Sequence, residues 1–145
     1  KDLNALVDEK MEYDLIKPNY AFALNNIGVA LDELGRKEES MKAYDLAIQI
    51  DPNYADAYYN KGLSFCNLAL IAQQDACNDL KDPKCIEDRR VIQSLYQSAR
   101  PCMEKVRQLQ PENSARWASP LYRIYLNLNM GKEFDEIDAV LKKMK

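Results

Sequence analysis

A repeat of 34 residues constrains the fold of this chain more than any other feature. The stretches 18–28 and 52–62 are identical at seven of eleven positions, and both begin with Pro-Asn-Tyr. Self-similarity at a period of 20 to 50 residues indicates stacked supersecondary units, each of which buries its apolar face against its neighbours. The spacing therefore predicts an array of repeated units.

Residue chemistry predicts that each unit is a pair of helices. Gly28 and Gly62 fall inside helical patterns, where glycine costs about 1 kcal/mol relative to alanine. A helix accepts that cost where a neighbouring helix must come close. Gly35 is placed to break the first helix and begin a tight turn. The second helix then has one apolar face at spacings of three and four residues, formed by Ser40, Tyr44, Ala47 and Ile48.

The first unit resembles the tetratricopeptide repeat. The matching positions are Leu24 in the usual tryptophan place, then Asn26, Ile27, Gly28, Leu34, Gly35, Ser40, Tyr44, Ala47 and Pro52. The resemblance implies an all-α fold: helix-turn-helix repeats in a short right-handed superhelix of about seven helices. A narrower similarity, in residues 96–101 and 120–125, is to exported tetratricopeptide proteins of Bacteroidetes.

The repeat pattern divides one domain, residues 1–145, into four segments. We expect the second helix of a truncated repeat, a regular first repeat, a second repeat with elongated helices, and a C-terminal helix pair: 1–17, 18–54, 55–111 and 112–145. Pro111 lies 59 residues after Pro52, so the second repeat holds an insertion at about 69–94. The chain begins with Lys1 rather than methionine, and we expect it to be a fragment of a longer protein.

The insertion is expected to be a helical hairpin. The first helix should run to about Asn78, and Asp82 with Pro83 should begin the returning helix, as cap and first-turn proline. We expect Pro101 to kink or interrupt that helix. Met130 and Gly131 should form the last turn.

Four cysteines leave two alternatives at the tip of the hairpin. Cys77 and Cys85 flank it and form either a disulfide, which would imply an oxidising compartment such as a periplasm, or two free thiols. Cys66 and Cys102 are expected to be buried small hydrophobes. Cysteine pairs with zinc-ligand spacing are absent from the sequence. An exported or periplasmic location is favoured over a cytoplasmic one.

Composition argues against several classes of function. The chain has no histidine and a net charge of −3, which argues against histidine-based catalysis, a metal or other cofactor, and a nucleic-acid partner. Membrane insertion is not expected, because no apolar stretch approaches about 18 residues. Acidic pairs on amphipathic helices read as solvated faces, and no phosphate-binding loop is present. The sequence therefore predicts a protein that is not an enzyme.

The family resemblance implies a scaffold that binds a protein or peptide in a concave groove. Residues carried over as groove positions are Phe22, Asn25, Val29, Asp32, Tyr59, Leu63, Tyr122 and Tyr125. The alternative for each tyrosine is packing within the protein itself. Residues for a two-carboxylate clamp are missing, since among its positions only Asn60 fits. Two other functions stay open: self-association through the apolar face of Leu141 and Met144, and, more weakly, a small-ligand pocket under the long hairpin.

Overall fold

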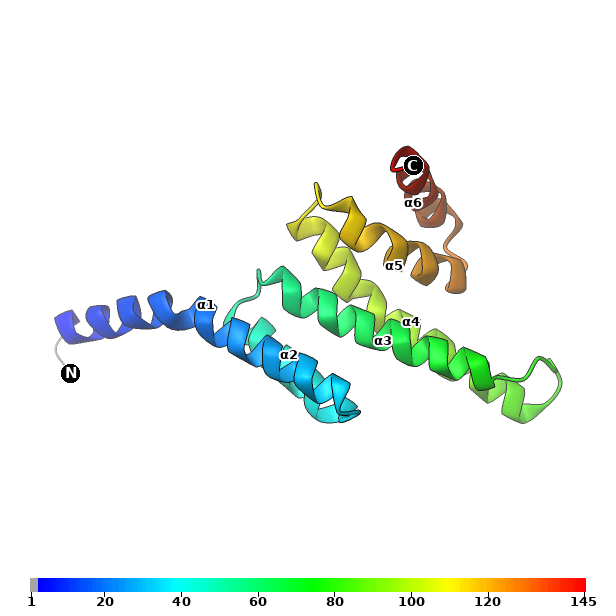
Figure 1. The fold of residues 1–145 in the computed structure, drawn as a ribbon, viewed down its shortest axis with the longest axis horizontal. Helices are drawn as coiled ribbons and strands as arrows, with labels where there is room; N and C mark the ends of the chain where they lie inside the picture. The colour runs from blue at the N-terminus through cyan, green and yellow to red at the C-terminus, as the bar shows by residue number, and fades with distance from the viewer. Residues whose placement is uncertain (1–2) are drawn as a thin grey trace. The chain divides into compact units, whose positions relative to one another are not determined.

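A computed structural model describes the backbone of residues 3–145 and the side chains from residue 16 onward. Six α-helices and no strand occur in this range (Figure 1). The all-α prediction is therefore confirmed for these residues, with six helices rather than about seven. The chain divides into two compact units, Lys1–Asn60 and Lys61–Lys145, and each is described below by itself.

The first helix, α1 (Leu3–Glu33), runs through Pro18 without a break. The expected boundary between a helix of residues 1–17 and the next helix is therefore wrong. A proline inside a helix removes one backbone hydrogen bond, which costs about 3 kcal/mol, and that cost did not end this helix. The expected apolar stripe Leu3, Leu6, Val7, Met11 and Leu15 lies outside the described side chains.

A tight turn joins α1 to α2 (Lys37–Ile50). Gly35 has a φ of +79°, the left-handed region that favours glycine. Its N–H donates to Asp32 O, and the N–H of Arg36 donates to Leu31 O at 2.9 Å. Together these bonds satisfy carbonyls at the end of α1 that have no partner within the helix. The turn thereby folds α2 back along α1.

Tyr44 of α2 lies flat against Gly28 of α1. A Cβ added at Gly28 would come within 2.5 Å of Tyr44 Cε1, and Tyr44 itself is fully buried. Ser40 Oγ donates to Gly28 O at 2.8 Å, so Ser40 anchors the same contact. The close approach inferred from glycine at this position is thus made by an aromatic ring.

The second unit contains most of a long helical hairpin, α3 (Ala55–Asp75) and α4 (Pro83–Leu109) (Figure 1). Asp82 caps α4 by accepting from the N–H of Lys84, with Pro83 in the first turn, as predicted. The first helix of this hairpin, α3, ends at Asp75 rather than near Asn78 as predicted. Gly62 of α3 faces the Met103 methyl group and Cys102 Cβ of α4.

Pro101 does not interrupt α4, which continues from Pro83 to Leu109. Pro101 and Gln97, whose carbonyl loses its donor, are both exposed, so water can satisfy that carbonyl. The other face of α4 is buried, including Ala99, Met103 and Val106. Burial of this face offsets the local loss, and the predicted interruption is wrong.

The last helices, α5 (Ser114–Asn127) and α6 (Gly131–Lys143), pack on each other. The turn between them has Asn129 at a φ of 55°, while Gly131 is already the first residue of α6. The expected Met130–Gly131 turn is therefore shifted, because asparagine tolerates the left-handed region better than other non-glycine residues. The N–H of Met130 donates to Tyr125 O, which is equivalent to the bond from Arg36 to Leu31 in the first turn.

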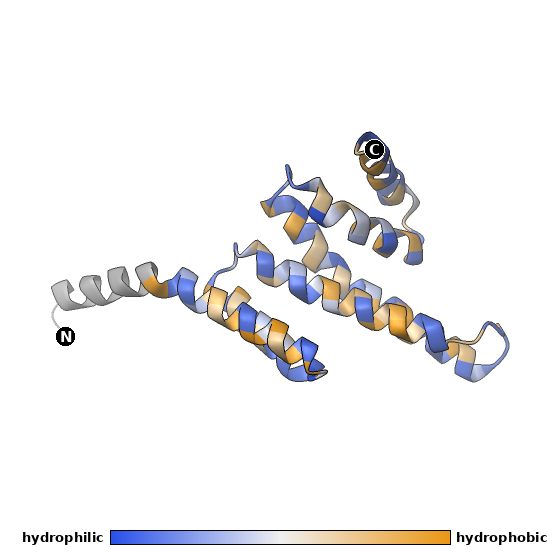
Figure 2. Ribbon diagram, in the orientation of Figure 1, coloured by the Kyte–Doolittle hydropathy of each residue, from blue (hydrophilic) through white to orange (hydrophobic). Residues whose placement is uncertain are grey.

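Trp117 anchors α5 to the end of α4. Its Nε1 donates to Gln110 O at 2.9 Å, and the guanidinium of Arg107 lies 4.9 Å from its ring centroid. Leu121, Ile124 and Ile137 are fully buried around the α5–α6 contact. Polar and apolar residues are interleaved along the coloured helices (Figure 2). None of the described helices is both long and apolar enough to span a membrane.

Candidate functional site

The groove residues predicted on α1 have very different exposures. Phe22 is 57% exposed and Val29 is half-buried, whereas Asn25 is buried. Asn60 Nδ2 donates to Asn25 Oδ1 at 3.0 Å, which links α1 to the start of α3. Asn25 was predicted to face a partner and instead joins two helices. A buried amide needs such a bond, so the role of Asn25 is structural.

Asp32, another predicted groove residue, is held by two neighbours on α2. Tyr44 Oη donates to its Oδ2 at 2.8 Å, and Lys37 Nζ lies 3.0 Å from its Oδ1. Burial, together with the hydrogen bond to Asp32, raises the pKa of Tyr44 well above that of a free tyrosine. The Asp32 carboxylate therefore fixes the α1–α2 pair.

Two predicted groove residues lie on α3, near its start. Tyr59 and Leu63 are both half-buried, so each leaves part of its side chain at the surface.

The two tyrosines predicted on α5 differ from each other. Tyr122 is half-buried, and its ring centroid lies 4.7 Å from that of Phe134 on α6. Tyr125 is 3% exposed and its Oη donates to Glu104 Oε1 at 2.8 Å. Burial, and then this bond, raises the pKa of Tyr125. Tyr125 therefore packs within the protein, which was the alternative for each tyrosine.

An exposed apolar stripe on α1 was missed by the sequence analysis. Its large side chains are 43 to 71% exposed: Ile16, Tyr20 and Ile27 on α1, and Leu34, the first residue after the helix. Ala23 and Ala30 lie between them and are exposed too. The spacing of the six residues alternates between four and three, which is the seam pattern of packed helices. At about 3.6 residues per turn, the stripe lies on nearly the opposite face of the helix from the groove positions implied by the family resemblance, Phe22, Asn25, Val29 and Asp32.

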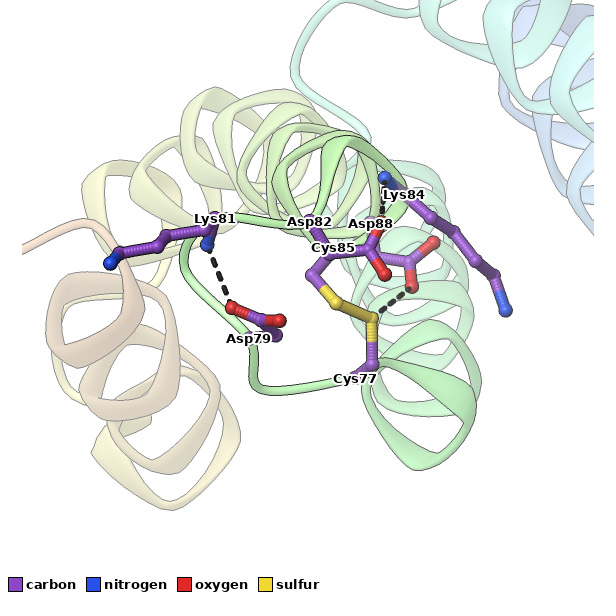
Figure 3. Close-up of a disulfide and its surroundings, with 7 residues drawn as sticks. All are labelled: Cys77, Asp79, Lys81, Asp82, Lys84, Cys85 and Asp88. Carbon is purple, nitrogen blue, oxygen red and sulfur yellow. Dashed lines mark hydrogen bonds between the residues drawn. A yellow bond between two sulfur atoms is a disulfide. The ribbon is translucent and has the colours of Figure 1, made fainter.

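Cys77 and Cys85 are joined by a disulfide at the tip of the hairpin (Figure 3). Their Cα atoms are 5.1 Å apart, within the ordinary range for a disulfide. The N–H of Lys81 donates to Asp79 Oδ1 at 2.9 Å, which tightens the loop between the two cysteines. The bond joins the end of α3 to the first turn of α4.

The two remaining cysteines do not form a reactive pair. Cys66 and Cys102 are both buried, and neither is part of a disulfide. Burial raises the pKa of the Cys66 thiol to about 11, so the thiol is protonated near neutral pH and a poor nucleophile. Within the described range, no group of three or more cysteine or acidic side chains is arranged to hold a metal ion.

Comparison with known proteins points to one repeat type. Residues 32–68 match the family model of the TPR, or tetratricopeptide, repeat. The stretch runs from the end of α1, through α2, into α3. It supports the resemblance to this family.

Two curated proteins share this similarity over short stretches. A peroxisomal targeting signal receptor of Candida albicans is 38% identical over 53 residues, which cover 37% of this chain and 9% of the receptor. The probable UDP-N-acetylglucosamine–peptide N-acetylglucosaminyltransferase SPINDLY of Eustoma exaltatum subsp. russellianum is 35% identical over 57 residues, 34% of this chain and 6% of the transferase. The chain thus spans less than a tenth of either relative. No solved structure shows a significant match.

Proposed function

We propose that this chain is a non-catalytic tetratricopeptide domain that binds a protein partner. The match at residues 32–68 supports the repeat, and repeats of this type generally mediate contacts between proteins. The similarity to a glycosyltransferase is confined to 6% of that enzyme. It therefore carries no argument for transferase activity in this chain.

The apolar stripe on α1 is the observation that carries the proposal. Exposed apolar residues gathered on one helix face mark an interaction surface more often than scattered ones do. Alternating spacing of four and three residues suits a helix of the partner, whose side chains would fit between Ile16, Tyr20, Ile27 and Leu34. Alanines at positions 23 and 30 would allow that helix a close approach.

The predicted groove residues contribute to the proposal according to their exposure. Five of them keep exposed or half-exposed surface: Phe22 and Val29 on α1, Tyr59 and Leu63 on α3, and Tyr122 on α5. We propose these as partner contacts in the groove of the right-handed superhelix that the family resemblance implies, a surface distinct from the α1 stripe. Asn25, Asp32 and Tyr125 act by holding neighbouring helices.

Self-association is a second candidate function, favoured by two apolar surfaces. Met144 is 46% exposed and Leu141 is half-buried on α6. The α1 stripe has the same spacing read in either direction, so a second copy could pair with it in an antiparallel arrangement. Tyr20 would then oppose Ala30 and Ala23 would oppose Ile27, a large residue against a small one in each case.

Light scattering over a range of concentrations separates the two candidates. A partner-binding domain stays monomeric at all concentrations, whereas self-association raises the mass as concentration increases. Replacement Ile27→Lys should abolish any such rise, while Leu46→Lys on α2, also exposed, serves as the matched control. A dimer that persists in Ile27→Lys would exclude pairing through α1.

The oxidising compartment is also proposed, on the strength of the tip disulfide. Disulfides persist in secreted and periplasmic proteins and are rare where thiols are kept reduced. The two curated relatives come from a yeast and a plant, so they do not support a bacterial source. Thiol counting on protein isolated without reductant from its native host tests the proposal: four reactive thiols after denaturation would contradict it.

A further inference from the structure

A cavity of about 410 Å³ lies within the second unit, beside the hairpin tip. Its walls come from the end of α3, the following loop, the first turns of α4 and the end of α5. The hairpin extends past the end of α5 (Figure 1), and all but one of the lining residues lie between positions 73 and 93. The inserted residues of the second repeat therefore create the cavity.

A chain of hydrogen bonds fixes one side of this cavity. Tyr96 Oη donates to Gln73 Oε1 at 3.0 Å, and Gln73 Nε2 donates to Asn127 Oδ1 at 2.8 Å. Asn127 Nδ2 in turn donates to Arg123 O. Both carboxamides are thus oriented by protein partners on α4 and α5. Fixed polar groups at a cavity preorganise it for a ligand, since little order is lost on binding.

Among the described residues, Arg89 is the one cation that lines the cavity. Its side chain is half-buried, and no acceptor among the described residues bonds to it. Gln93, one turn further along α4, and Asn78 on the loop also line the space, without a hydrogen bond to the described residues. The next residue in the sequence, Arg90, is by contrast paired with Glu87 at 3.3 Å.

We propose that this cavity binds a small organic monocarboxylate with a compact apolar body. The guanidinium fork of Arg89 matches the two oxygens of a carboxylate. Ala76, Leu80 and Ile92 provide apolar wall for the body. The volume falls near the lower end of the 300 to 1,000 Å³ typical of small-ligand sites. An acid the size of an amino acid fits these features.

The charge around Arg89 favours a monoanion over a phosphate dianion. Asp88 precedes Arg89 in sequence. Its Oδ2 lies 3.8 Å from Sγ of Cys77, and Cys77 lines the cavity. A single cation with a carboxylate nearby neutralises one negative charge better than two. The site does not depend on the proposal made for α1.

The disulfide couples the site to the redox state of the protein. Cys77, Asn78 and Leu80 form one wall, and the bond to Cys85 ties that wall to α4 (Figure 3). Reduction releases the loop at Cys77, so the wall loses its fixed position and ligand binding must order it again. Affinity for the carboxylate is therefore expected to fall on reduction.

Nuclear magnetic resonance titration with N-acetyl-L-leucine tests the proposal. The side-chain amide signals of Gln73, Gln93 and Asn127 should shift and saturate. The uncharged N-acetyl-L-leucinamide should bind about tenfold more weakly or worse, because hydrogen bonds to a charged group are among the stronger ones. Arg89→Gln should weaken binding of the acid by a similar factor. Arg90→Gln removes the same charge from the neighbouring position and should leave affinity unchanged.

Several outcomes would overturn the proposal. These are no saturable shift, equal binding of acid and amide, or an equal loss in Arg89→Gln and Arg90→Gln. Tighter binding of inorganic phosphate would replace the carboxylate with a phosphate site. Binding only of an acetylated tripeptide ending in leucine would instead indicate a peptide end as ligand. Unchanged affinity in Cys77→Ser/Cys85→Ser would remove the redox coupling, with circular dichroism checking that each variant is folded.

Discussion

Gly28 and Gly62 occupy equivalent positions, 34 residues apart, yet different side chains lie against them. The buried, rigid ring of Tyr44 covers Gly28, and its hydroxyl is held by Asp32. The flexible end of Met103 and the small Cys102 cover Gly62. The same sequence signal therefore marks one contact that cannot adjust and one that can. In the α3–α4 pair, the disulfide and the hydrogen bonds of Gln73 hold the two helices in place instead.

The largest expected effect is at Gly28. Gly28→Leu should lower the free energy of unfolding by several kcal/mol, because the added carbons overlap the Tyr44 ring and overpacking of a tight core is costly. Even Gly28→Ala should cost about 3 kcal/mol. Gly62→Ala should cost about 1 kcal/mol or less, since Met103 can move and alanine favours the helix. Urea unfolding followed by circular dichroism measures both, and equal losses would erase the contrast.

Removing the tip disulfide should have the next largest effect on stability, and the effect should be confined to the α3–α4 hairpin. Cys77→Ser/Cys85→Ser should lower the free energy of unfolding by about 2–3 kcal/mol on the loop-entropy model, for a separation of eight residues. Trp117 is the one tryptophan of the chain and lies in the second unit, so its fluorescence follows that unit. An unchanged fluorescence transition would show that the extension does not depend on the bond.

A smaller difference should separate Tyr44→Phe from Tyr96→Phe. The Tyr44 hydroxyl bonds a carboxylate, and its loss should cost about 1.5–3 kcal/mol; the Tyr96 hydroxyl bonds a neutral amide, and its loss should cost about 0.5–1.5 kcal/mol. Thermal unfolding of the two variants provides the comparison. A larger loss for Tyr96→Phe would mean that the Tyr96–Gln73 hydrogen bond contributes more to stability than the Tyr44–Asp32 hydrogen bond.

Alkaline pH should destabilise both units gradually. Burial raises the pKa of Tyr44, Tyr96 and Tyr125 above the value of about 10 for a free tyrosine. The unfolded chain therefore releases protons before the folded one does, and stability falls as pH rises above about 10. Below that pH all three hydroxyls are protonated in both states, and they add no pH dependence. Urea midpoints at pH 8, 10 and 11 check this, and constant midpoints would contradict it.

Much of the fold follows from short-range sequence signals. Three features each depend on a few neighbouring residues: the turn at Gly35, the start of α4 at Asp82 and Pro83, and the helical fold class. Local chemistry fixes such features largely by itself. Predictions of this kind could be made without knowledge of tertiary contacts.

Proline positions show where local signals fail. Helix α1 continues through Pro18. Helix α4 continues through Pro101 because burial of its long apolar face outweighs the loss of one backbone hydrogen bond. Whether that face is buried depends on distant residues.

Candidate site residues were harder to predict for the same reason. The family resemblance placed Asn25 and Tyr125 in the groove, but their hydrogen bonds depend on Asn60 and Glu104 from other helices. The cavity at the hairpin tip needs three helices and the loop in place together. The spacing of the apolar stripe on α1, in contrast, is present in the sequence, whereas its exposure requires the structure.

Partner capture with matched α1 and α2 variants tests the central claim most directly. The domain and its variants Ile27→Lys and Leu46→Lys would be immobilised and exposed to extract of the native host, with bound protein quantified by mass spectrometry. Both replacements put lysine at an exposed apolar position, so each should change folding stability by about 0.5 kcal/mol or less. We expect one protein to be retained in stoichiometric amount by the wild type and by Leu46→Lys, and lost from Ile27→Lys. Equal retention by Ile27→Lys would contradict a binding role for the stripe on α1.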